Sequence, residues 1–144
     1  MILTCPPQSV IVSPQAIGEA GGMGRSVLLI EDEPHIAEAI RYVLSRDGWE
    51  VASHADGSDA IEVIRRLLPD VLVLDVMLPG RSGHEILADI RSDPALAALP
   101  VLVLTARGLR DMPEGATRVM AKPFVNADVV SAVRAIAPRT GAAE

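Results

Sequence analysis

Short apolar runs alternate with amphipathic segments along most of the chain. The runs SVLLI at 26–30, VLVLD at 71–75 and VLVLTA at 101–106 are too short for helices and apolar enough for buried strands. EVASH at 50–54 and RVMA at 118–121 are weaker strand candidates. Because EVASH is the more polar of the two, it is expected at an edge of the sheet.

Four amphipathic segments follow these runs, with apolar residues at the spacing of an α-helix. They span residues 34–48, 56–70, 82–93 and 126–137. Pro34 suits a first helical turn, Gly48 a left-handed C-terminal cap and Pro69 a helix stop. The third segment opens with Ser82 and Glu85 in a capping box, and the fourth with Asn126 as the expected N-cap.

Strands that alternate with helices predict an α/β fold, a parallel sheet covered by helices on both faces. We expect one domain at residues 25–138 and a short frayed tail at 139–144. Residues 1–24 contain several prolines and glycines and predict a flexible extension. A start of translation at Met23, which would make the first 22 residues an artefact, is an equal alternative.

The composition excludes several classes of protein. The net charge of -6 argues against a nucleic-acid-binding domain, which would carry a basic face. No apolar run reaches the roughly 20 residues of a membrane span. The single Cys5 cannot form an internal disulfide, which fits a reducing, cytoplasmic location. Only Trp49, Tyr42 and Phe124 are aromatic, so the core must be aliphatic.

Polar residues stand at the carboxyl ends of the predicted strands, where parallel sheets place their functional groups. Glu31, Asp32 and Glu33 follow the run at 26–30, and Asp75 ends the run at 71–75. Thr105 lies at the end of the run at 101–106, and Lys122 follows the run at 118–121. These acids could simply be the solvated end of a strand. However, two carboxylates ~4 Å apart repel by about 4 kcal/mol at an effective dielectric near 20, so a cluster favours a bound cation.

Oxygen ligands without paired Cys or His favour Mg²⁺ over Zn²⁺, and Mn²⁺ can substitute for it. Mg²⁺ usually shares its ligand shell with phosphate oxygens, so the cluster predicts a site that meets a phosphoryl group. Asp75, at the end of the most apolar run, is best placed to attack phosphorus and form an acyl phosphate.

The motifs VLLIEDEP, VLVLDVMLPGRSG, VLVLTA and AKPF, in this order, resemble the receiver domain of two-component response regulators. The resemblance covers residues 25–138. It implies the flavodoxin-like fold, a doubly wound five-stranded parallel sheet of order 2-1-3-4-5 with five flanking helices.

By this resemblance, Asp75 is the phosphoacceptor and receives phosphate from the phosphohistidine of a sensor kinase. Asp32 and Asp75 would bind Mg²⁺ directly, Glu31 through a metal-bound water, and Met77 through its backbone carbonyl. Family members often carry Asp at the position of Glu31. Lys122 and Thr105 would bind the phosphoryl group, and the bond between Lys122 and Pro123 would be cis.

Two features depart from the family pattern. Val119 stands where the family usually has Tyr or Phe, whose ring moves with the threonine when the domain is phosphorylated. The segment RGLRDMPE at 107–114 is short and contains Gly108 and Pro113, so it predicts a shortened or irregular fourth helix.

Other polar residues have simpler interpretations. Glu33 is expected to stabilise a helix N-terminus rather than bind metal. His35, His54 and His84 lack partners at ligand spacing and are expected at the surface. Arg107, next to the threonine, is a candidate for shielding the phosphoryl group from water.

The sequence therefore predicts a stand-alone response regulator receiver, a switch with self-catalysed phosphotransfer and slow autodephosphorylation rather than an enzyme. Its expected partners are a sensor histidine kinase or a histidine phosphotransfer protein, and an unknown downstream protein reached by direct contact or by phosphate relay. Binding to DNA or to a membrane is not expected. The alternatives are a pseudo-receiver that binds partners without phosphorylation and, less favoured because DVM lacks a second acid, an aspartyl-phosphate phosphohydrolase.

Overall fold

The computed structural model describes residues 11–12, 25–106 and 114–138. The expectations for the rest of the extension at 1–24, for Arg107 and the fourth-helix region, and for the tail at 139–144 lie outside the described residues. Among the described residues, no helix is both long enough and apolar enough to span a membrane.

The sheet contains the five predicted parallel strands in the predicted order. β3 and β2 pair, β2 pairs with β4, β4 with β5, and β5 with β6, which gives order 2-1-3-4-5 for these strands in sequence. The strands are β2 (Ser26–Ile30), β3 (Glu50–His54), β4 (Val71–Asp75), β5 (Val101–Thr105) and β6 (Arg118–Ala121).

A sixth strand, β1 (Ile11–Val12), was not predicted. It pairs antiparallel with β3, with Ile11 opposite Ser53 and Val12 opposite Ala52. Two residues are too few to leave a periodic pattern in the sequence, so only the structure reveals this strand. Within the described part of the chain, β3 is the outermost parallel strand, as expected, but β1 lies beyond it.

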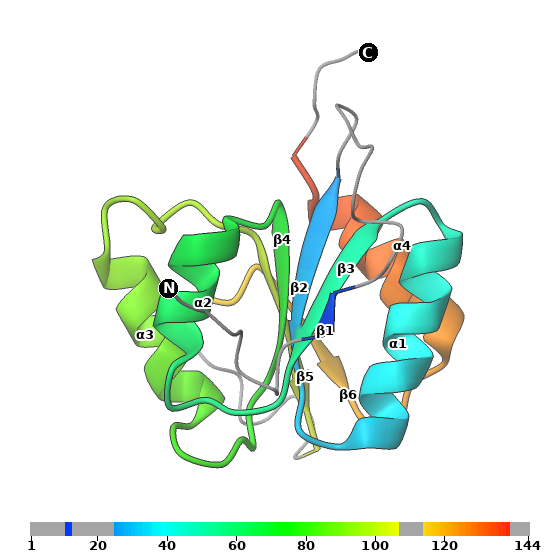
Figure 1. Cartoon of the computed structure of the whole chain (residues 1–144), viewed down its shortest axis with the longest axis horizontal. Coiled ribbons are helices and arrows are strands. Elements are labelled where there is room, and N and C mark those ends of the chain that lie inside the picture. Colours follow the sequence, from blue (N-terminus) through cyan, green and yellow to red (C-terminus); the bar gives the residue numbers. More distant parts are fainter. Residues whose placement is uncertain (1–10, 13–24, 107–113, 139–144) are drawn as a thin grey trace.

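Helices cover both faces of the sheet, as the alternating pattern predicted. α2 (Ala60–Leu67) and α3 (Gly83–Ser92) lie on one face, and α1 (Pro34–Arg46) and α4 (Asn126–Ile136) lie on the other (Figure 1). The fold is thus a flavodoxin-like doubly wound sheet between two layers of helices.

Each strand contributes apolar side chains to both faces, because successive residues of a strand point to opposite sides. In β2, Leu28 and Ile30 pack with α2 and α3, whereas Val27 and Leu29 pack with α1 and α4. β4 and β5 are buried along their whole length. Their near-continuous apolar sequences are therefore explained by burial of both faces of each strand.

The helix ends agree with the sequence signals in all but one case. The side chain of Glu33 accepts hydrogen bonds from the backbone N–H groups of His35 and Ile36 at the start of α1. Ser82 and Glu85 form the predicted capping box of α3. The prediction for α4 was wrong, because Val125 occupies the N-cap position and Asn126 is the first residue of the helix.

Trp49 lies at the amino ends of the strands, opposite the predicted site at their carboxyl ends. It is the only tryptophan and directly precedes β3. Its ring is buried, the guanidinium of Arg25 lies 4.4 Å from the ring centroid, and its Nε1 donates to Asp47 at 3.2 Å. The functional candidates lie at the other ends of the strands.

Candidate functional site

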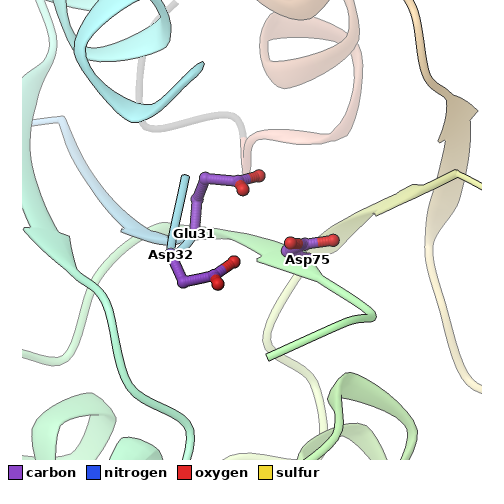
Figure 2. A group of neighbouring side chains, drawn as sticks. All are labelled: Glu31, Asp32 and Asp75. Atoms are coloured by element: carbon purple, nitrogen blue, oxygen red, sulfur yellow. The ribbon is translucent and has the colours of Figure 1, made fainter. Parts of the chain in front are cut away.

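Three carboxylates converge where β2 and β4 end. Ile30 of β2 pairs with Leu74 of β4, so the residues that follow, Glu31 and Asp75, lie side by side. Carboxylate oxygens of Glu31, Asp32 and Asp75 lie within 4.8 Å of one another (Figure 2). The register of the parallel strands therefore creates the acidic cluster that the sequence predicted.

The three acids differ in exposure. Glu31 and Asp75 are each 2% exposed, whereas Asp32 is exposed to solvent. The position of Glu31 is fixed from both ends, because its backbone N–H donates to the carbonyl of His54 at 3.0 Å and its Oε2 accepts from the backbone N–H of Glu33 at 3.1 Å. The cluster thus has two buried carboxylates and one accessible carboxylate.

A single ammonium group connects the two buried acids. Nζ of Lys122 lies 3.2 Å from Oε1 of Glu31 and 3.3 Å from Oδ1 of Asp75. The backbone N–H of Lys122 donates to the carbonyl of Thr105 at 2.8 Å, and the peptide bond to Pro123 is cis, as predicted. The end of β6 is therefore fastened to the end of β5, with the lysine side chain directed at the acids.

One oxygen in this cluster is incompletely satisfied. Oε1 of Glu31 is buried and accepts no hydrogen bond from the described residues, although Lys122 lies within ion-pair distance. Burial of a carboxylate without full hydrogen bonding is costly, so the oxygen favours a further cation or a proton.

The electrostatics of Glu31 express the same imbalance. Burial, and then repulsion by Asp75, raises the pKa of Glu31 from 4.5 to about 7, although Lys122 and the N–H of Glu33 act in the opposite direction. Among the described residues, three carboxylates face one ammonium group, so their negative charge is under-neutralised. Such an arrangement can bind a hard divalent cation.

The other predicted residues lie around this cluster. Thr105 is fully buried at the end of β5. The backbone N–H of Met77 donates to Oδ1 of Asp75 at 3.3 Å, and the Met77 side chain is 55% exposed. Val119 is half-buried in β6 and packs against the core between the sheet and the α2–α3 layer.

Glu33 does not join the three acids. Its side chain caps α1, as predicted. His54 was expected at the surface, and that prediction was wrong: the residue is 1% exposed, and its Nε2 lies 2.7 Å from Oδ1 of Asp59. A His at the end of a strand can be buried when a carboxylate in the next loop supplies a partner, which sequence spacing alone did not indicate.

Gly83 is a residue that the motifs did not single out. A Cβ at this position would lie 2.5 Å from the carbonyl oxygen of Asp75. The backbone N–H of Gly83 donates to the carbonyl of Val76 at 2.8 Å. Only glycine allows α3 to begin this close to the end of β4. The signal in the sequence was the glycine directly after the N-cap serine.

The sequence and the structure match known proteins over most of the chain. Residues 27–134 match the family model described as the response regulator receiver domain. The "Probable transcriptional regulatory protein TcrX" of Mycobacterium tuberculosis is 41% identical over 127 residues, which cover 85% of this chain and 53% of that protein.

Two solved structures extend this comparison. A Chloroflexus aurantiacus chain assigned to the response regulators is 35% identical, with a TM-score of 0.73 over 78% of this chain and 97% of that one. The receiver domain of the sensor histidine kinase PA1611 from Pseudomonas aeruginosa, solved with a magnesium ion in its active-site cleft, is 29% identical, with a TM-score of 0.72 and coverage of 78% and 97%.

The curated relatives are longer than the region they share with this chain. The chain spans about half the length of the curated relatives it matches, which are regulators of transcription or DNA-binding response regulators. The similarity therefore concerns the part of each relative that corresponds to the fold described above.

Proposed function

Because the chain belongs to the family of response regulator receiver domains, we propose that Asp75 accepts a phosphoryl group from a sensor histidine kinase or a histidine phosphotransfer protein. Receiver domains of two-component systems are phosphoacceptor switches. The observation that carries the proposal is the position of Asp75, which ends the central strand beside two other carboxylates and 3.3 Å from the ammonium of Lys122.

The residues of the cluster fit Mg²⁺, which receiver domains bind through their acidic residues. Asp32 and Asp75 would bind the ion directly, Glu31 through a water molecule, and Met77 through its carbonyl. The donor set consists of oxygens, and the buried Oε1 of Glu31 accepts no hydrogen bond from the described residues. A bound Mg²⁺ would neutralise the developing negative charge on the phosphoryl oxygens.

The attack would come from Oδ2 of Asp75. The backbone N–H of Met77 and the ammonium of Lys122 both contact Oδ1, so Oδ2 is the oxygen that these two contacts leave for the attack. The new bond joins this oxygen to phosphorus, and the bond between phosphorus and the donor's nitrogen breaks, so the donor imidazole departs with the electron pair.

Lys122 and Thr105 would hold the transferred group. The lysine is already beside the acceptor carboxylate, and the hydrogen bond from its N–H to the carbonyl of Thr105 keeps the two residues together. An ammonium and a hydroxyl aimed at the equatorial oxygens stabilise the charge that develops during transfer. Both residues therefore support the acceptor role of Asp75.

The test is incubation with acetyl phosphate and MgCl₂, followed by intact mass spectrometry. We expect one added phosphoryl group, lost in Asp75→Asn and retained in Asp128→Asn, which changes an exposed aspartate of α4. The adduct should not form when EDTA replaces the metal. An unmodified wild-type protein, or an adduct that persists in Asp75→Asn, would refute the proposal.

The output of the switch would be a contact with a downstream protein or a relay of phosphate. The net charge of -6 argues against direct contact with DNA and favours a protein partner. Val119 offers the domain no aromatic ring at the position where the family usually has one. This favours a second candidate, a pseudo-receiver, which would bind its partner equally well in wild type and in Asp75→Asn.

A further inference from the structure

Two loops meet beside the acidic cluster, the β3–α2 loop (residues 55–59) and the β4–α3 loop (residues 76–82). The backbone N–H of Gly57 donates to the carbonyl of Pro79 at 3.0 Å, and the N–H of Arg81 donates to the same carbonyl at 2.9 Å. The first loop is therefore hydrogen-bonded to the loop that directly follows Asp75.

Each loop brings a glycine against the other. A Cβ on Gly57 would lie 2.2 Å from the carbonyl oxygen of Arg81, closer than two atoms can approach. A Cβ on Gly80 would lie 2.8 Å from Oδ1 of Asp56 and 2.9 Å from Cβ of Ser58. The two loops interlock at a distance that admits no side chain on either glycine.

The β3–α2 loop is held in place by contacts of its own side chains. Oδ1 of Asp56 accepts hydrogen bonds from the N–H and the hydroxyl of Ser58, at 2.7 and 2.8 Å, and these bonds lower the pKa of Asp56. Asp59 contacts the buried His54 at 2.7 Å. Gly57 itself is buried, so this loop has little room to move away from its neighbour.

The β4–α3 loop is more exposed than the β3–α2 loop and directly follows Asp75. Met77, Pro79 and Gly80 are exposed. At its start, Met77 donates to Oδ1 of Asp75 at 3.3 Å. A shift of residues 79–81 would therefore reach Met77 through two to four residues of backbone. It would move the Met77 carbonyl and the N–H that contacts the Asp75 carboxylate.

We propose that Gly57 is a positioning residue of the Asp75 site: through its close contact with Pro79 and Arg81, it holds the loop that supplies the Met77 carbonyl and orients the acceptor carboxylate. The inference rests on the function proposed for Asp75. The hydrogen bond and the close contacts of Gly57 are with Pro79 and Arg81, so it acts on the site through the second loop.

The test compares Gly57→Ala with Gly48→Ala. Gly48 lies before β3, at the amino ends of the strands, whereas Gly57 follows β3. Gly48 has a φ of +95°, and a Cβ there meets nothing within 4 Å. An alanine at position 48 thus lowers stability through its backbone conformation alone. Urea unfolding measures the stability of both variants, and calorimetric titration with MgCl₂ measures metal affinity.

We expect Gly57→Ala to raise the Kd for Mg²⁺ about tenfold or more, the usual effect of removing support from metal ligands, and to slow labelling by acetyl phosphate. Gly48→Ala should bind Mg²⁺ like wild type even where its stability is equally reduced. In the metal-free protein, the amide resonances of residues 76–78, 80 and 81 should shift in Gly57→Ala only.

If Gly57→Ala does not fold, Gly80→Asn decides, since asparagine tolerates a positive φ and its Cβ meets the β3–α2 loop from the other side. A folded Gly57→Ala or Gly80→Asn with the wild-type Kd would overturn the inference. A wild-type protein that binds no Mg²⁺ and accepts no phosphate would instead overturn the function on which it rests.

Discussion

The ammonium of Lys122 lies 3.3 Å from Oδ1 of Asp75 and also contacts Glu31, so one positive charge is shared between two buried carboxylates. It arrives there from β6, the strand farthest from β3 in the sheet. In the proposed function, this ammonium is the cation that would meet an incoming phosphoryl oxygen.

The first prediction concerns this lysine. Lys122→Met should slow labelling by acetyl phosphate about a hundredfold or more, because an aligned positive group is lost from the site of developing charge. Affinity for Mg²⁺ should stay the same or rise, since the carboxylates lose their internal counter-ion. Mass spectrometry measures the first effect and calorimetry the second.

Lys122→Arg serves as the comparison, because it retains the charge but changes the geometry. It should label faster than Lys122→Met. Equal labelling of Lys122→Met and wild type would show that the lysine does not assist the transfer.

The second prediction concerns the stability of the metal-free protein. The folded protein holds a proton on Glu31 up to about pH 7, whereas the unfolded chain releases it near 4.5. The stabilisation is therefore complete below pH 4.5 and is lost as the pH rises through about 7. Over this window, the free energy of unfolding in EDTA should fall by on the order of 2 kcal/mol, as measured by urea titration.

Glu31→Gln should remove most of this slope, because the amide does not titrate. Hydrogen bonds from Arg134 to Asp47 and from Arg65 to Asp93 lower the pKa of these two aspartates, whose contributions are complete above their ordinary value of 3.8. The two aspartates therefore do not contribute to the change in the free energy of unfolding between pH 4.5 and 7. A metal-free wild type whose stability is constant or rises between pH 4.5 and 7 would contradict the prediction.

The third prediction separates Glu33 from its two acidic neighbours. Glu33→Ala should cost about 1 kcal/mol in the free energy of unfolding, because α1 loses its N-terminal cap. The Kd for Mg²⁺ should change little. Glu33→Gln, which retains an accepting oxygen, should be closer to wild type in stability. Loss of metal binding in Glu33→Ala with a normal fold would show instead that Glu33 is a ligand.

The fourth prediction concerns the two-sided core. Leu72→Ala removes a fully buried side chain of β4 and should cost about 3 kcal/mol. Leu68→Ala, at a position that is 65% exposed, should change the free energy of unfolding by less than about 0.5 kcal/mol. Thermal or urea unfolding followed by circular dichroism measures both. Similar losses in the two variants would contradict the assigned packing.

The order of the parallel strands was predicted from the family resemblance, whereas the convergence of the acids with Lys122 followed from the pattern of residues alone. Strand ends are visible as the last apolar residue before a polar one, and parallel strands share an edge, so Glu31, Asp75 and Lys122 could be brought together without coordinates. The capping box of Ser82 and Glu85 was equally local, since both partners lie within one helical turn.

The features that escaped prediction depend on contacts between loops or on very short elements. Burial of His54 requires Asp59 to turn back toward the strand end, and the role of Gly57 requires a neighbouring loop at contact distance. The N-cap of α4 was predicted at Asn126, one residue after its actual position at Val125, because the backbone conformation rather than the residue type sets where the helix begins.

Trp49, buried at the amino ends of the strands, can serve as an intrinsic fluorescent probe of folding. Because it is the only indole in the chain, its emission reports one environment. The ring is buried, stacked under Arg25 and hydrogen-bonded to Asp47, so unfolding must change its emission. Ligand binding at the carboxyl ends, a strand length away, should leave these neighbours in place. Intrinsic fluorescence should thus follow global unfolding while remaining silent to ligands at Asp75.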